Sequence, residues 1–207
     1  SEFKKDKLKV LAELTKLRQI CCDPRLHYED YKAGSAKLDT CMELVYGALD
    51  GGHRILLFSQ FTGMLDIIGK RLAKEDIAFL KLTGASSKES RAKMVAQFQA
   101  GEVPVFLISL KAGGVGLNLT AADVVIHYDP WWNVAAQDQA TDRAHRIGQQ
   151  HTVTVYKLIA KDTIEERIMQ MQESKRDLVN SVLGGDGISS ALFTREDVLA
   201  LLGGDGR

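Results

Sequence analysis

Apolar residues along the chain alternate between a helical spacing and short extended runs. A first helix is predicted over 4–22, because apolar residues recur there at every third position and form one stripe. These residues are Leu8, Leu11, Leu14, Leu17 and Ile20. Pro24 stops this helix, and the polar segment 23–35 is expected to be a loop. A second helix is predicted over 37–49, closed by the glycine pair that follows it.

Further along, short apolar runs alternate with amphipathic segments. The apolar run at 54–58 predicts a buried parallel strand, and further strands are predicted at 78–82, 105–109 and 124–128. The segment 152–159 alternates between apolar and polar residues and is rich in β-forming residues, which predicts a fifth strand. The amphipathic segments predict helices at 62–74, 86–99, 132–147, 163–183 and 194–202, with a Gly-rich linker at 184–190. Ser86 and Glu89 form a capping-box pattern at the start of one of these helices. The alternation predicts an α/β fold, in which helices cover both faces of a parallel sheet.

Composition and charge narrow the class of protein. The 207 residues carry 27 Lys+Arg and 27 Asp+Glu, so no strongly basic nucleic-acid binder is indicated, although a local basic face is compatible with these numbers. No apolar run is long enough to span a membrane, and we expect no membrane partner. Cys21, Cys22 and Cys41 lack the spacing of a zinc site or a disulfide framework, so we expect reduced thiols and no bound metal.

Ligands of parallel sheets bind outside the carboxyl ends of the strands, so the loops after those ends are the candidate sites. Residues 109–118 contain Gly113, Gly114 and Gly116, which let backbone N–H groups approach a phosphate or a ribose. These glycines match neither GxGxxG nor GxxxxGK[ST], and the 207 residues contain no Walker A motif. The segment therefore fits either a ligand loop or a tight turn between a strand and a helix.

The loop after the fourth predicted strand carries both tryptophans of the chain, Trp131 and Trp132. Adjacent side chains cannot both face the core, so an exposed tryptophan would form a contact surface. The alternative is a tryptophan lid on the core. Either reading makes the Asp129–Asn133 loop an unusual feature of the sequence.

A group of phosphate-binding side chains follows this loop. Gln139, Arg143 and Arg146 fall on one face of the predicted 132–147 helix. Two guanidiniums and an amide on one face suit the oxygens of a phosphate. The alternative is a solvated charged face, in which the arginines pair with Asp138 and Asp142.

Together these motifs resemble Swi/Snf-type DNA translocases, which belong to the superfamily-two helicases. The resemblance is carried by Asp129–Asn133 followed by residues 139–149, where Arg143 and Arg146 fall in motif VI. Upstream, residues 17–24 resemble the entry to the second motor lobe, and residues 58–61 resemble motif IV. Residues 82–87 with Arg91 resemble the motif that follows, and residues 109–118 resemble motif V. Val134 stands where the family usually has proline, a difference that removes no functional group.

The resemblance implies a domain organisation. Residues 1–50 would be leading helices and a loop packed on the lobe, 51–162 the RecA-like core of the C-terminal lobe, and 163–207 a brace helix and tail. The Walker A lysine and the DExH acid pair of the first lobe are not found in the 207 residues. We therefore expect half of a two-lobed motor, which would be inactive alone.

The resemblance also implies roles for particular residues. ATP would lie between the lobes, with Mg²⁺ and the triphosphate held mainly by the first lobe. The catalytic residues on this side would be the arginine fingers Arg143 and Arg146, with Gln139 positioning the nucleotide or coupling the lobes. The nucleotide-binding residues would be Gly114, Gly116 and Asn118. The contacts to double-stranded DNA would be Ser59, Gln60, Thr83, Gly84, Ser109, Lys111 and Trp132.

Alternatives remain at this stage. Ser59 and Thr83 flank predicted helix starts, so each could simply cap a helix. The chain could also be an interaction module without a catalytic role, whereas a nucleotide-binding oxidoreductase lacks support because the GxGxxG pattern is missing. The partners expected for the motor are double-stranded DNA and the N-terminal lobe of the same protein. Its location would be cytoplasmic and nucleoid-associated in a prokaryote, or nuclear in a eukaryote.

Overall fold

The computed structural model describes residues 2–113, 117–131, 134–144 and 152–183. Its helices are α1 (Glu2–Cys22), the 3₁₀ turn η1 (Pro24–Leu26), α2 (Ala36–Asp50), α3 (Thr62–Lys74), α4 (Lys88–Ala100), α5 (Leu110–Gly113), α6 (Val134–Thr141) and α7 (Ile164–Leu183). Its strands are β1 (Ile55–Ser59), β2 (Phe79–Leu82), β3 (Val105–Ser109), β4 (Val124–His127) and β5 (Thr154–Lys157).

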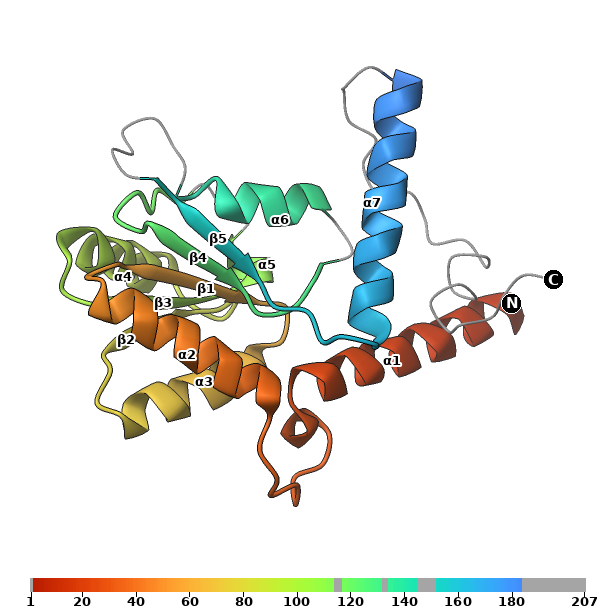
Figure 1. Ribbon diagram of the computed structural model, residues 1–207, viewed down its shortest axis with the longest axis horizontal. Helices are drawn as coiled ribbons and strands as arrows, with labels where there is room; N and C mark the ends of the chain where they lie inside the picture. Colours follow the sequence, from red (N-terminus) through yellow and green to blue (C-terminus); the bar gives the residue numbers. More distant parts are fainter. Residues whose placement is uncertain (1, 114–116, 132–133, 145–151, 184–207) are drawn as a thin grey trace.

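The strands form one sheet in the order β2-β3-β1-β4-β5, and every neighbouring pair is parallel (Figure 1). Helices α2 and α3 pack on one face of this sheet, and α4 and α6 pack on the other. The α/β architecture expected from the alternating pattern is therefore confirmed. The central strands β1, β3 and β4 are buried throughout, which explains their continuous apolar runs.

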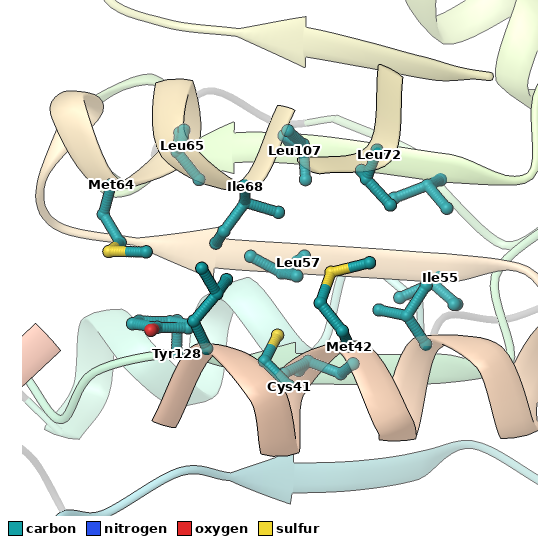
Figure 2. Close-up of a cluster of buried hydrophobic side chains, with 14 of the residues drawn as sticks. Cys41, Met42, Ile55, Leu57, Met64, Leu65, Ile68, Leu72, Leu107 and Tyr128 are labelled. Atoms are coloured by element: carbon teal, nitrogen blue, oxygen red, sulfur yellow. The ribbon is translucent and has the colours of Figure 1, made fainter. Parts of the chain in front are cut away.

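One hydrophobic core lies between the sheet and helices α2 and α3 (Figure 2). Met42 of α2 and Ile68 of α3 reach Leu57 of β1 from the two helices, and all three are buried. Cys41 belongs to the same core, where burial raises the pKa of its thiol to about 12. All three cysteines of the chain are free thiols.

A second core fills the opposite face of the sheet. Phe58 and Phe106 point there from β1 and β3, and meet Phe98 of α4 and Trp131 of the loop after β4. Each fully buried side chain of this size contributes about 1.5–3 kcal/mol relative to an exposed one. The two cores pack on both faces of the strands, whose carboxyl ends carry the candidate site.

Helices α1 and α7 contact each other beside the sheet, near the start of α7 (Figure 1). The spacing-three stripe predicted for α1 is wrong at Leu17, whose exposed fraction is 41%. The buried side chains of the described part of α1 are instead Leu14, Arg18 and Cys22, which recur at spacing four. An arginine therefore occupies the buried face of this helix.

Two further local predictions need correction. Ser87, rather than Ser86, caps α4: its Oγ accepts from the backbone N–H of Ser90, while the Oγ of Ser86 accepts from the N–H of Thr83. The helix predicted over 132–147 ends at Thr141, because residues 142–144 form turns. The predicted linker 184–190 and helix 194–202 lie outside the described residues.

Candidate functional site

The candidate site lies at the carboxyl ends of the central strands. Ser59 at the end of β1 pairs in register with Ser109 at the end of β3, and both are buried. After these two strands the chain leaves to opposite faces of the sheet, because α3 packs on one face and α5 on the other. Neighbouring strands with this arrangement form the crevice where α/β sheets bind ligands.

The loop after β4 is bound to the end of β1 by a buried carboxylate. The hydroxyl of Ser59 donates to Asp129 Oδ1 over 2.5 Å, and the backbone N–H of Gln60 donates to Asp129 Oδ2 over 3.2 Å. The side-chain amide of Gln60 donates to the carbonyl of Pro130 over 2.6 Å. The hydroxyl oxygen of Ser59 also accepts from the backbone N–H of Phe61. Phe61 is itself the N-cap residue of α3, and no side chain caps this helix, so Ser59 is not its N-cap.

Burial dominates the electrostatics of Asp129. Removal from water raises the pKa of this carboxyl, and the hydroxyl of Ser59 and the guanidinium of Arg18 act in the opposite direction. Arg18, only 4% exposed, donates to the carbonyl of Pro130 over 2.8 Å and lies 5.6 Å from the centre of the Phe61 ring. Helix α1 is therefore anchored directly on the loop that carries the candidate DNA contacts.

A buried ion pair extends this anchoring to α7. Lys37 Nζ lies 2.6 and 2.5 Å from the two carboxylate oxygens of Glu165, and the carboxylate also accepts from the N–H of Ala160 over 2.8 Å. Lys37 also lies 5.3 Å from the ring centre of Tyr128, whose hydroxyl donates to the carbonyl of Cys22 over 2.9 Å. The pair joins α2, α7 and the segment before Asp129.

Sequence reasoning missed Arg18, Lys37 and Glu165 as parts of this site. Their partners lie more than a hundred positions away along the chain, so no local pattern reveals them. One indication was available: Arg18 lies four positions after Leu14 and four before Cys22, on what is the buried face of a helix. A charged residue in that position indicates a specific partner, because burying it alone is costly.

The structure describes only one of the two tryptophans. Trp131 is buried in the second core, as the lid alternative predicted for one of them, and its backbone N–H donates to Gln137 Oε1 over 3.4 Å. Trp132, the proposed DNA contact, lies outside the described residues. Its role therefore stays a prediction.

His127, at the end of β4, lies at the centre of a second polar group. Its Nε2 is 2.9 Å from the hydroxyl of Thr141 on α6. Its ring stacks on Phe58 at a centroid distance of 5.5 Å and meets the edge of Trp131 at 6.3 Å. Burial, with a smaller contribution from Lys157, lowers the pKa of His127 to about 3. The imidazole is neutral at physiological pH.

The side chains predicted to bind phosphate, Gln139, Arg143 and Arg146, are placed only in part. Arg143, 7% exposed, lies in the turn after α6, and its carbonyl accepts from the N–H of Leu119 over 3.1 Å. This bond brings Arg143 next to Asn118, which is exposed at the end of the Gly-rich segment. Gln139 lies on α6 and is exposed, whereas Arg143 is buried in the turn beyond the end of that helix, so the predicted common helical face does not extend to Arg143. Arg146 lies outside the described residues.

The remaining candidates lie on neighbouring strand ends or outside the described part. Thr83 follows β2, and its Oγ1 accepts from the N–H of Ala85, so it closes a turn and does not cap α4. Gly84 is exposed, and Lys111 belongs to α5. Gly114 and Gly116 lie outside the described residues. Within the described residues, no group of three or more His, Cys, Asp or Glu side chains could hold a metal ion, and no helix is long and apolar enough to cross a membrane.

This sheet, with helices on both faces and candidate residues at the carboxyl ends of its strands, is a RecA-like α/β lobe. The chain belongs to the family of the "Helicase conserved C-terminal domain", whose model matches residues 36–148, more than half of the chain. All the site residues predicted from the sequence fall within this matched segment, whereas Arg18 and Glu165 lie outside it.

Three similar proteins identify the branch of this family. An "Uncharacterized ATP-dependent helicase" of Mycoplasma pneumoniae is 42% identical over 198 residues, which are 95% of this chain and 19% of that protein. The "Putative ATP-dependent helicase/translocase YwqA" of Bacillus subtilis is 42% identical over 195 residues, which are 90% of this chain and 21% of that protein. The solved structure "Sulfolobus solfataricus SWI2/SNF2 ATPase core in complex with dsDNA" matches with a TM-score of 0.75 at 37% identity, covering 95% of this chain and 42% of that chain.

The expected resemblance to the C-terminal lobe of SWI2/SNF2-type ATPases is therefore confirmed. The chain spans about a fifth of the length of the two curated relatives.

Proposed function

We propose that this chain is the second lobe of a motor that hydrolyses ATP and moves along double-stranded DNA. The observation that carries this proposal is the similarity, at 37% identity over 95% of the chain, to a SWI2/SNF2 core crystallised with double-stranded DNA. In the proposed motor, ATP binds in the cleft between this lobe and the N-terminal lobe of the same protein. The lobe is inactive alone, because it supplies only one side of that cleft.

On the nucleotide side, Arg143 and Arg146 act as arginine fingers. Their guanidiniums match the negative charge that develops on the transferred phosphoryl group. The bond between the Arg143 carbonyl and the N–H of Leu119 supports this role, because it brings Arg143 next to Asn118 and the end of the Gly-rich segment. Gly114 and Gly116 let the backbone approach the nucleotide, and Gln139 orients it or couples the lobes.

The residues proposed for the nucleotide side fit phosphate oxygens better than a cation. They carry guanidinium and amide donors and no carboxylate. Mg²⁺ prefers carboxylate and phosphate oxygens, so it is assigned to the first lobe and to ATP itself. When bound, ATP supplies the phosphoanhydride whose cleavage drives the motor.

On the DNA side, the proposed contacts follow three neighbouring strands. Ser59 and Ser109 end paired strands, and Thr83 follows β2, whose Leu82 pairs with Ile108. The remaining proposed contacts are Gln60, Gly84, Lys111 and Trp132. Ser59 and Ser109 are buried, and the Ser59 hydroxyl donates to Asp129, so these two side chains position this edge of the sheet. The Thr83 hydroxyl, backbone N–H groups and Lys111 bind phosphates without reading sequence, as tracking along a duplex requires.

The nucleotide side is tested in the full-length parent protein. Arg146→Ala is expected to lower kcat by about 10³–10⁵ and to leave ATP binding largely intact. Arg71→Ala is the matched control, because Arg71 lies near the end of α3 and pairs with Glu75, the residue just after that helix. Wild-type turnover in Arg146→Ala would refute the finger assignment.

The DNA side is tested by the salt dependence of binding. Lys111→Ala in the parent is expected to weaken binding equally for all duplex sequences and to lower the slope of log K against log salt by about 1. An unchanged slope would remove Lys111 from the DNA contacts.

A further inference from the structure

The proposed DNA contacts and the proposed nucleotide contacts meet on the same short stretch of chain. The loop after β4 binds the proposed DNA contacts Ser59 and Gln60 through Asp129 and Pro130 and continues to Trp131, and α6 leads to the turn that holds Arg143. A motor must transmit movement between two such sites. Within the described residues, His127 contacts both the loop and the helix.

The hydrogen bonds around His127 define its tautomer. The hydroxyl of Thr141 lies 3.3 Å from the carbonyl of Gln137, one turn earlier on α6, and donates its only proton there. The same oxygen lies 2.9 Å from His127 Nε2, and with its proton directed at Gln137 it accepts from that nitrogen. This arrangement favours the Nε2–H tautomer of His127, whose buried Nδ1 has no partner within the described residues.

Gln137 closes the connection to the loop. Its carbonyl receives the proton of Thr141, and its side-chain oxygen accepts from the backbone N–H of Trp131 over 3.4 Å. The Trp131 ring in turn stands perpendicular to the imidazole, at an interplanar angle of 89°. His127, Thr141, Gln137 and Trp131 thus form a closed circuit of contacts, which we call the His127 circuit. All four side chains are buried or half-buried.

Packing leaves the imidazole little freedom. His127 is 1% exposed, and Phe58 stacks on it with an interplanar angle of 19°. A phenylalanine in its place would keep this stacking but lose the donor to Thr141. The stacking and the hydrogen bond can therefore be separated by substitution.

We propose that His127 is a positioning residue that fixes helix α6 on the Trp131 loop, so that the proposed DNA and phosphate contacts move as one body. This inference rests on the proposed function for its consequence, the coupling of hydrolysis to movement. Its structural part, the donation from Nε2–H to Thr141, stands independently. A purely packing role for His127 would require the aromatic ring only.

The structural part is tested on the chain itself by ¹⁵N NMR of its histidines. The His127 ring, assigned by its absence in His127→Gln, is expected to show a protonated Nε2 and an unprotonated Nδ1 between pH 6 and 8. In Thr141→Val this preference for one tautomer is expected to weaken. A protonated Nδ1, or an equal mixture in the wild-type chain, would overturn the proposal.

The functional part is tested in the full-length parent by base pairs moved per ATP hydrolysed. His127→Phe and Thr141→Val are each expected to lower this ratio about 2–10-fold. This factor is the free energy of one neutral hydrogen bond, about 0.5–1.5 kcal/mol, converted to a ratio. The double variant is expected to be no worse than either single one, because both remove the same bond. A fully additive double variant would contradict this.

Conservative variants separate positioning from packing. His127→Gln keeps a donor near the position of Nε2, and Thr141→Ser keeps the hydroxyl, so both are expected to retain most of the ratio. His53→Phe is the matched control for histidine replacement, because His53 is half-exposed and bound to Asp123 before β1. If His127→Phe matches the wild type and His127→Gln does not, ring packing alone operates and the proposal fails.

The two proposals fail differently. A wild-type parent without DNA-stimulated hydrolysis would refute the proposed function, whereas the tautomer measurement would be unaffected. A wild-type parent that is fully active, with variants that keep the wild-type ratio, would refute only the role of His127. Thermal unfolding of each variant shows whether a loss reflects coupling or failure to fold.

Discussion

Lowering the pH should destabilise the folded chain, because His127 is buried in its neutral form. Replacing His127 by glutamine removes the titrating group while keeping a polar side chain. In the wild type the pKa of this imidazole is about 3 in the folded chain and about 6.5 in the unfolded one. Between pH 6.5 and pH 3, His127 therefore binds a proton in the unfolded chain but not in the folded chain. The contribution of the neutral, buried imidazole to the stability of the folded chain is fully present above pH 6.5 and is lost as the pH falls towards 3.

The magnitude follows from the separation of these two values. Each pH unit in that window changes the free energy of unfolding by about 1.4 kcal/mol, so the loss between pH 7 and pH 4.5 is about 2.5 kcal/mol. His127→Gln lacks this contribution. The stability difference between the wild type and this variant should therefore shift by about 2.5 kcal/mol in favour of the variant over that range.

Urea unfolding followed by circular dichroism at four pH values between 7 and 4.5 measures this shift. Phe58→Leu serves as the control, because it disturbs the same stack without removing a titrating group. It is expected to lower stability by about 1.5 kcal/mol or less and to keep the acid dependence of the wild type. A stability difference between wild type and His127→Gln that is constant across the pH range would refute the reasoning.

Two further predictions concern stability at neutral pH. Lys37→Met is expected to cost about 3–5 kcal/mol by equilibrium unfolding, because it leaves the Glu165 carboxylate buried without its cation. Lys37→Met/Glu165→Leu should recover most of that loss, and a double variant no more stable than the single one would contradict this account. Gly101→Ala is expected to cost about 1–2 kcal/mol, because Gly101 ends α4 at φ +81°. Gly84→Ala is its control, since a Cβ there meets no atom within 4 Å.

Local patterns in the sequence predicted the sheet and most of its helices. The runs at Val105–Ser109 and Thr62–Lys74 have the predicted bounds, because a continuous apolar run and an amphipathic period are local properties. Patterns failed where two local choices were nearly equal. Ser86 and Ser87 both precede a helix, and only the turn that binds Ser86 to Thr83 leaves Ser87 as the cap.

Helix α1 shows a second limit of local patterns. Its leucines at spacing three suggest a stripe through Leu17, yet Arg18 is buried instead. The reason is tertiary: Arg18 binds the carbonyl of Pro130 and faces Asp129, which no property of α1 itself reveals. Tertiary partners override a weak local period.

The candidate site was likewise predicted correctly in some parts and wrongly in others. The motifs place Ser59 and Ser109 at strand ends, and the structure brings them together in register, because parallel strands end at one edge. The predicted common face of Gln139 and Arg143 is not found, because α6 ends at Thr141 and the turn that follows buries Arg143. His127 was missed because its importance depends on side chains from three different elements.

The central claim is that this lobe works only as half of a DNA-dependent ATPase. The most direct test is ATP hydrolysis by the full-length parent without DNA, with single-stranded DNA and with double-stranded DNA, beside the same assay on this chain alone. The account predicts strong stimulation of the parent by double-stranded DNA and no hydrolysis above background by the chain alone. A parent that double-stranded DNA does not stimulate, or hydrolysis by the isolated chain, would contradict it.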